Sequence, residues 1–237
     1  MSAPPTVDRV APFLIDRAAT MCPRRLRRHF QDIKGDGGFV ARGRIRDVIV
    51  WAARAAHADG GTPNPDSFSV PDSLVPEEQA LLRRANEHYL ALFADDPLET
   101  IENDAFDAPV VADRGDFKVG GWIDLVGRRP DGDVELRQFE LWGRTPSADP
   151  LESPTILLAC LRIRKALTPE RIRIRHADLI RGTLDEHTAD LSGGPGEMAA
   201  LFSRRLAMIR ARTFKGEAVP GRDCTTCPFA NGCPAFR

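Results

Sequence analysis

Apolar and polar residues alternate along the first hundred residues in a way that predicts helices. Residues 8–31 read as helical, and a glycine-rich break follows them. Apolar side chains recur at helical spacing through residues 40–58, and the acidic residues after Pro76 favour a helix that runs to about residue 94. The Pro- and Gly-rich stretch between these two helices predicts a loop. We therefore expect a helical region at about 40–95.

Strand-like segments take over after residue 98. They are rich in β-branched and aromatic residues, and a turn signal, RRPDGD, joins the second segment to the third. The expected order is strands at 98–111, 117–127 and 134–143, a helix at 154–167, strands at 171–180 and 183–189, and a helix at 196–213. This order predicts one α/β domain over residues 1–237, with a central mixed sheet flanked by helices and the 40–95 region as a helical insertion.

Length and composition indicate what kind of protein this chain is. At 237 residues and 42% hydrophobic, it can bury a core without covalent staples. No run of eighteen apolar residues exists, so we expect no membrane partner. The first residues lack the pattern of a secretory signal, so we expect a cytoplasmic protein, where clustered cysteines favour metal binding over disulfides.

Net charge is −1, which gives no global attraction to nucleic acid. Arginines nevertheless cluster locally, as in Arg24–Arg28, Arg42–Arg46 and Arg171–Arg175. Such clusters can bind phosphates, or arginine can simply be the preferred surface cation of this chain.

Four cysteines form the clearest chemical motif. Cys224 and Cys227 are two residues apart, and Cys233 follows after a segment whose Gly232 lets the chain curl back. Three thiolates need a fourth ligand, and Cys22 is the best candidate because, like Cys227 and Cys233, it precedes a proline. We expect this metal centre to join the two termini through a tail at about 220–237.

Four thiolates suit a 4Fe-4S cluster or a tetrahedral structural zinc. A zinc ribbon usually has two CxxC knuckles, whereas this chain has one knuckle and two single cysteines, which favours iron-sulfur. Cys160 lies between apolar residues of a predicted helix, so we expect it to be a core residue.

These motifs resemble the RecB-like branch of the PD-(D/E)XK nucleases that carry an iron-sulfur clasp, such as the CRISPR-associated RecB-like exonucleases and the nuclease domain of AddB. The likeness covers nearly the whole chain. It rests on Cys22 in C-P-R-R, Asp124 in the strand GGWIDLV, Glu140 in the strand QFELWG, and the C-x2-C-x5-C tail. It implies a restriction-endonuclease-like fold with a 4Fe-4S cluster, in which Asp124 and Glu140 hold Mg²⁺ or Mn²⁺ for phosphodiester cleavage.

The chain departs from that family at several positions. The catalytic lysine position holds Trp142, which could stack on a DNA base or fill the metal cavity. The metal-binding histidine would fall near Arg46, where an arginine would repel a metal ion, and His57 is too far along the same helix to replace it easily. The remaining departures are Thr155 and Ala159 at the Gln/Tyr positions, with Arg144 and Lys165 as alternative cations. Asp124 and Glu140 could instead lie at solvated strand ends or form a salt bridge with a nearby arginine.

Three functions follow. The first is DNA binding or processing, on a single strand or a duplex end, with cleavage lost or altered. The second is an active Mg²⁺-dependent exonuclease with a rearranged site. The third is a redox-sensing or interaction subunit beside a helicase or within a larger complex.

Overall fold

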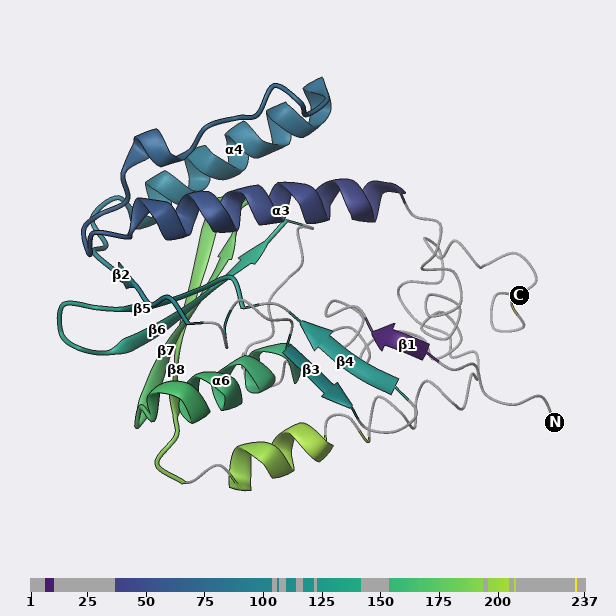
Figure 1. Cartoon of the computed structure of the whole chain (residues 1–237), viewed down its shortest axis with the longest axis vertical. Coiled ribbons are helices and arrows are strands. Elements are labelled where there is room, and N and C mark those ends of the chain that lie inside the picture. Colours follow the sequence, from purple (N-terminus) through teal and green to yellow (C-terminus); the bar gives the residue numbers. More distant parts are fainter. Residues whose placement is uncertain are drawn as a thin grey trace.

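A mixed five-stranded sheet forms the centre of the molecule (Figure 1). The computed structural model describes residues 7–10, 37–103, 106, 110–113, 117–121, 123–141, 154–193, 196–204, 207 and 233. The strand order is β2-β5-β6-β7-β8. Their bounds are β2 Glu99–Thr100, β5 Leu125–Arg128, β6 Val134–Glu140, β7 Arg171–Asp178 and β8 Thr183–Asp190. The α/β prediction is confirmed at this level.

The central pair of the sheet is parallel and the others are antiparallel. β6 and β7 run side by side from Val134 opposite Ile172 to Glu140 opposite Asp178. A parallel pair needs a crossover connection, and α6 (Pro154–Leu167) lies within it. β5 and β6 instead form a hairpin, whose turn is closed by Gly132 donating to the Arg129 carbonyl at 2.9 Å.

Two helices cover one face of the sheet. In α3 (Gly37–Ala56), buried residues recur at helical spacing at Ile45, Ile49, Ala53 and Ala56. α4 (Pro76–Phe93) buries Leu82, Ala85, Tyr89 and Phe93 in the same way. Both helices pack in one hydrophobic cluster with residues of β5, β6 and β7. The helical region expected at 40–95 is therefore confirmed, with the 3-10 turn η2 (Pro65–Ser67) in the loop between the helices.

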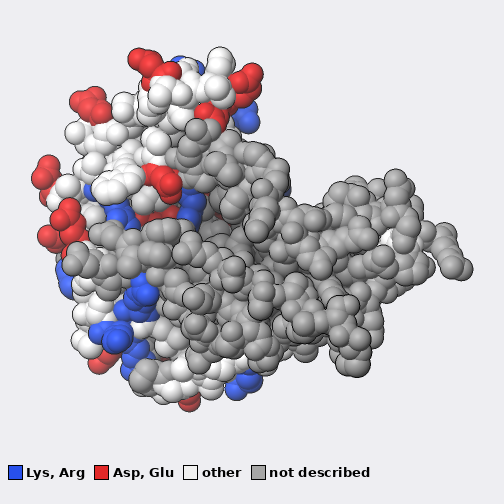
Figure 2. Space-filling model, turned by 45° about the vertical axis from the view of Figure 1, so that its right-hand side comes forward, with Lys and Arg blue, Asp and Glu red and all other residues white. Residues whose placement is uncertain are grey.

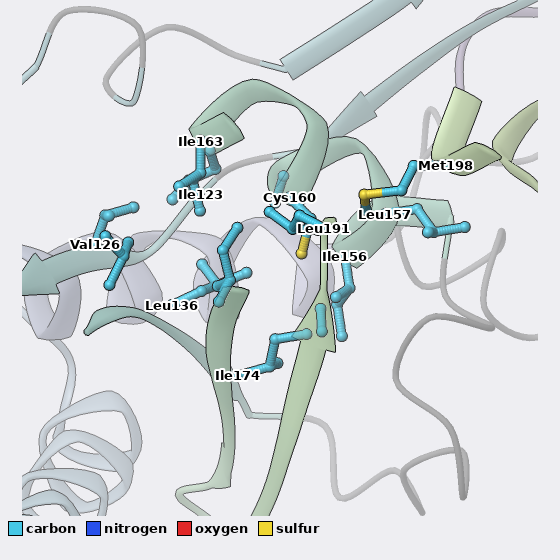
Figure 3. Packing of buried hydrophobic residues seen from close by; sticks show 14 of the residues in the cluster. Ile123, Val126, Leu136, Ile156, Leu157, Cys160, Ile163, Ile174, Leu191 and Met198 are labelled. Atoms are coloured by element: carbon cyan, nitrogen blue, oxygen red, sulfur yellow. The ribbon is translucent and has the colours of Figure 1, made fainter. Parts of the chain in front are cut away.

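Helix α6 covers the opposite face, together with the helical residues 196–204. Leu136 of β6 and Ile174 of β7 face this layer, and Cys160 is fully buried in it. Figure 3 shows the Cys160 side chain among Ile156, Leu191 and their neighbours. Cys160 is a core residue, as its sequence context predicts.

A second, three-stranded sheet has the order β1-β4-β3, with β1 Val7–Val10, β3 Val110–Asp113 and β4 Phe117–Gly121. It corrects three expectations. The strand expected at 98–111 is instead two strands, β2 in the large sheet and β3 in this one. Residues 8–10 form a strand rather than a helix, because they pair in parallel with β4. The strand expected at 117–127 is two strands: β4 belongs to the small sheet and β5 to the large one.

Every residue of β6 is buried, which follows from helical layers on both faces. In the part of the chain that the structure describes, no helix has both the length and the hydropathy to span a bilayer.

Candidate functional site

Asp124 lies in the short connection between β4 and β5 and is fully buried. The β5–β6 register pairs Leu125 with Arg137, so Asp124 lies at the end of the hairpin where β6 reaches Glu140. The backbone N–H of Phe139 donates to Asp124 Oδ2 at 2.8 Å. The two acids of the sequence motif therefore lie at the same end of neighbouring strands.

The second oxygen of Asp124 faces an arginine. Nη2 of Arg46, from helix α3, lies 2.8 Å from Asp124 Oδ1. The Arg46 side chain is 15% exposed and the Asp124 side chain is 0% exposed, so the pair is shielded from solvent. Arg46 is the residue that the sequence places near the family's metal-binding histidine.

A second arginine of α3 holds the backbone on either side of the carboxylate. Arg54 donates from Nε to the Asp124 carbonyl at 2.9 Å and from Nη2 to the Ile123 carbonyl at 3.2 Å. Arg46 and Arg54 are eight residues apart, which is about two helical turns. Helix α3 therefore fixes the Asp124 segment through two guanidinium groups.

Burial raises the pKa of the Asp124 carboxyl above its ordinary value. The Arg46 guanidinium and the Phe139 N–H oppose this rise because both stabilise the charged form. A carboxylate that has lost its water shell depends on those two partners, and the chemistry of the site is that of a buried ion pair.

Glu140 ends β6 and is also buried, at 4% exposure. Its carbonyl accepts the N–H of Leu179 at 3.0 Å, and its register partner on β7 is Asp178. The Asp178 carboxylate is used by the turn that follows it, since Oδ1 accepts the N–H groups of Ile180 and Arg181.

Several expected site residues lie elsewhere or outside the described residues. Ala159 is a core residue of α6, and Lys165 is exposed near the end of that helix. Trp142, Arg144 and the side chain of Thr155 lie outside the described residues.

The described residues include only one of the four cysteines expected to hold a cluster, so the structure does not test whether they come together. Cys233 is half-buried, and Cys22, Cys224 and Cys227 lie outside the described residues. Within the described segments, no group of three or more His, Cys, Asp and Glu side chains is placed to hold a metal ion. The cluster thus stays a prediction that rests on the chemistry of its donor set.

Sequence reasoning missed a buried polar network on the α3–α4 side of the sheet. Its centre is Arg137, which has no exposed surface. Arg137 donates to Glu135 Oε1 at 2.6 Å and to Asp96 Oδ2 at 2.7 Å. Asp96 also receives Nη1 of Arg129 at 2.6 Å and a guanidinium N–H of Arg175. Three arginines therefore converge on one carboxylate.

The network extends to the helices through His57 and Tyr89. Arg137 Nη1 lies 2.9 Å from His57 Nε2 and 3.1 Å from the Tyr89 hydroxyl. His57 is therefore directed at β6, not at the Asp124 pair. Charged and apolar residues alternate in VELRQFE, and this pattern is typical of a strand with one face in solvent. The network could therefore be recognised only once the structure showed that both faces of β6 are buried.

Comparisons with known proteins add little to this picture. No protein-family model matches the chain, and no curated protein matches it. Among solved structures, the chain is similar to the crystal structure of SSO0001, with a TM-score of 0.39 and 13% sequence identity, over 97% of this chain and 87% of that chain. A likeness at this level identifies neither a family nor a function.

Proposed function

We propose that this chain is a RecB-like nuclease-fold protein that binds DNA without metal-dependent cleavage. The observation that carries the proposal is the 2.8 Å contact between Arg46 and the fully buried Asp124. It supports a site in which a fixed cation of the protein has replaced a catalytic metal ion.

The arrangement of the strands supports the RecB-like part of the proposal. The sequence motif of the RecB-like nucleases has an acidic residue on one strand, a turn, and a second acidic residue on the next strand. Asp124 precedes β5, a tight turn follows β5, and Glu140 ends β6. The Phe139 N–H bond to Asp124 joins the two strands at this end.

The arginine supports the loss of cleavage. A divalent ion in such a site needs hard carboxylate oxygens that no other cation occupies. One oxygen of Asp124 is bonded to the Phe139 N–H, and the other is paired with the Arg46 guanidinium. A metal ion at Asp124 would have to displace the Arg46 guanidinium from the carboxylate with which it pairs among the described residues, because two cations beside one carboxylate repel each other strongly.

The same arginine supports phosphate binding. A guanidinium has five N–H donors, and the contacts described for Arg46 use the nitrogen Nη2. Arg46 and Arg54 match the charges of Asp124 and Glu140 in number, so phosphate binding at this end depends on guanidinium N–H donors and not on a net positive charge. Basic side chains also gather at the lower left of the face in Figure 2, with acidic ones beside them.

Four cysteines would hold a 4Fe-4S cluster in this proposal: Cys22, Cys224, Cys227 and Cys233. Their thiolates fit the ligand set that such clusters need. The cluster would supply a structural link between the two ends of the chain.

A binding and cleavage assay tests the function. Purified protein should bind fluorescein-labelled single-stranded DNA with an affinity that falls as salt rises, and the affinity should be unchanged by EDTA. Incubation with Mg²⁺ or Mn²⁺ should leave the DNA intact. An absence of salt-sensitive binding would refute DNA binding. Cleavage that disappears in both Asp124→Asn and Glu140→Gln would instead establish an active nuclease.

An anaerobic preparation tests the cluster. We expect iron and inorganic sulfide in the purified protein and a broad absorption in the visible spectrum. Cys224→Ser should abolish this absorption, whereas Cys160→Ser should leave it unchanged because Cys160 lies in the core. Stoichiometric zinc in place of iron would refute the iron-sulfur assignment.

A further inference from the structure

Strand β8 forms one edge of the five-stranded sheet (Figure 1). It is eight residues long, Thr183–Asp190, and pairs with β7 without a shift in register. The strand at the other edge, β2, has only two residues, and Thr100 of β2 donates its N–H to the His57 carbonyl at 3.1 Å. The end of α3 therefore occupies the β2 edge, whereas nothing in the described part of the chain pairs with the outer side of β8.

The hydrogen bonds to β7 show which backbone groups of β8 face outward. Leu191 directly follows the strand and donates its N–H to the Glu170 carbonyl, beside the start of β7, at 2.7 Å. Backbone groups of an antiparallel strand point to alternate sides, so every second residue before Leu191, starting with its immediate neighbour, directs its N–H and C=O away from β7. These residues are Leu184, Glu186, Thr188 and Asp190. A row of donors and acceptors therefore lies along the outside of β8, where another extended chain can pair with it.

Strand β8 lacks most of the features by which proteins protect the edge of a sheet. Such edges are usually very short, broken by a bulge, or interrupted by proline or lysine. The regular register leaves no bulge between Thr183 and Asp190, and the strand contains neither proline nor lysine. The side chains of Glu186 and Thr188 are exposed, so a partner has room beside the strand.

The charge of the edge indicates which partner fits it. Three carboxylates lie on β8, those of Asp185, Glu186 and Asp190, and the strand has no lysine or arginine. Glu186 pairs with Arg175 of β7, whereas Asp185 and Asp190 form no ion pair with the described residues. Two copies of β8 paired edge to edge would bring together three carboxylates from each, and like charges across strands are destabilising. A segment that carries lysine or arginine would neutralise these charges.

We propose that the outer edge of β8 binds an extended, basic segment of a partner protein, which adds a strand to the sheet. The outward backbone groups supply the hydrogen bonds, as in other cases of strand addition. Asp185 and Asp190 select lysine and arginine side chains. The proposal goes beyond the proposed function and does not depend on DNA binding, because it assigns the chain a surface for a protein partner.

Fluorescence anisotropy with labelled peptides as long as β8 tests the proposal. A peptide of alternating lysine and valine should bind, and a peptide of alternating glutamate and valine should not. A lysine–valine peptide that is N-methylated at every backbone amide keeps its charges but cannot pair as a strand, so its affinity should be at least about tenfold lower. Absence of binding by the unmethylated peptide, or equal affinity of the methylated one, would overturn the proposal.

Thr188→Pro is the variant that blocks the edge. The Thr188 N–H faces outward, so proline removes a donor from the outer row and leaves the hydrogen bonds to β7 in place. We expect the lysine–valine peptide to bind at least about tenfold more weakly. Thr188→Val is the matched control, since it keeps the N–H and should bind as the wild-type protein does. Unchanged affinity in Thr188→Pro would contradict pairing at this edge.

Asp185→Asn combined with Asp190→Asn tests the charges without proline. Peptide binding should weaken by about three- to tenfold, and its dependence on salt should become less steep. Unchanged affinity would show that these carboxylates do not select the partner. Sedimentation of the protein alone tests the other occupant of the edge: a dimer that Thr188→Pro dissociates would assign β8 to a second copy of this chain and overturn the proposal.

Discussion

Nη1 of Arg137 lies 2.9 Å from Nε2 of His57, and neither side chain is exposed to solvent. A guanidinium can only donate, so Nε2 of His57 is an acceptor and the imidazole is neutral. The proton sits on Nδ1, which lies 3.0 Å from the Gly61 carbonyl. Burial and the nearby Arg137 charge lower the pKa of His57 to about 4.

This histidine predicts that the fold loses stability in mild acid. Between pH 6.5 and about 4, the unfolded chain binds a proton at His57 that the folded chain does not. The contribution of neutral His57 to the free energy of unfolding should therefore be complete above pH 6.5. As the pH falls to about 4, the free energy of unfolding should decrease by on the order of 3 kcal/mol. Urea unfolding at several pH values measures it.

His57→Gln is the comparison variant. It keeps a polar side chain of similar length but cannot titrate, so its free energy of unfolding should depend less on pH over the same interval. Identical pH dependence in both proteins would show that His57 titrates normally in the fold.

Removal of Arg46 should destabilise the fold. Arg46→Ala leaves the buried carboxylate of Asp124 without its ionic partner, and such a loss costs about 3–5 kcal/mol. Arg46→Ala combined with Asp124→Asn should regain part of that loss, because an amide costs less to bury than a charge. Chemical denaturation of the two single variants and the double variant measures the coupling.

Arg171→Ala is the control for this cycle. Arg171 pairs with Asp133 at 3.0 Å, but its side chain is 65% exposed, so its removal should cost no more than about 1 kcal/mol. Equal effects of Arg46→Ala and Arg171→Ala would contradict a buried, structural pair at Asp124.

Gly127 should not tolerate a methyl group. A Cβ at this position of β5 would lie 2.4 Å from Leu98 Cγ, and Leu98 is fully buried. Gly127→Ala should therefore lower the free energy of unfolding by about 1–3 kcal/mol through overpacking. Gly61→Ala should be nearly neutral because nothing lies within 4 Å of its added Cβ. A melting temperature equal to that of the wild-type protein for Gly127→Ala would disprove the clash.

Cys160 should resist alkylation while the protein is folded. Burial raises the pKa of its thiol to about 12, and the thiolate is the reactive form. We expect iodoacetamide to modify Cys160 only after unfolding, as measured by mass spectrometry of the peptide that contains it. Modification at the same rate with and without urea would show that α6 opens readily.

The elements of the large sheet could be predicted because their signals are local. The helical spacing of Ile45, Ile49 and Ala53 and the RRPDGD turn each indicate one structure without help from distant residues. The division of residues 117–127 between two sheets could not be predicted, since a bend between β4 and β5 depends on which strands are available as partners. The same applies to residues 8–10, which become a strand only beside β4.

The sequence allows the positions of the candidate site and a salt bridge between its acids and a nearby arginine to be predicted, but not which arginine forms it. Asp124, Glu140 and Arg46 were each singled out from the sequence, and a charge repulsion between Arg46 and a metal ion was expected. That Arg46 pairs with Asp124 depends on how α3 packs on the sheet, which spans a separation of nearly eighty residues. The Arg137 network was missed for the same reason, because its partners come from six different segments.

The parallel pairing of β6 and β7 has a consequence for how the chain acquires its shape. The two strands are neighbours, yet residues 141–170 separate them, so the centre of the sheet cannot close while the chain is still short. Until β7 arrives, Arg137 and Glu135 remain hydrated on an isolated hairpin. We expect the last step of folding to be slow and cooperative, because these charged side chains lose their hydration only when β7 pairs with β6.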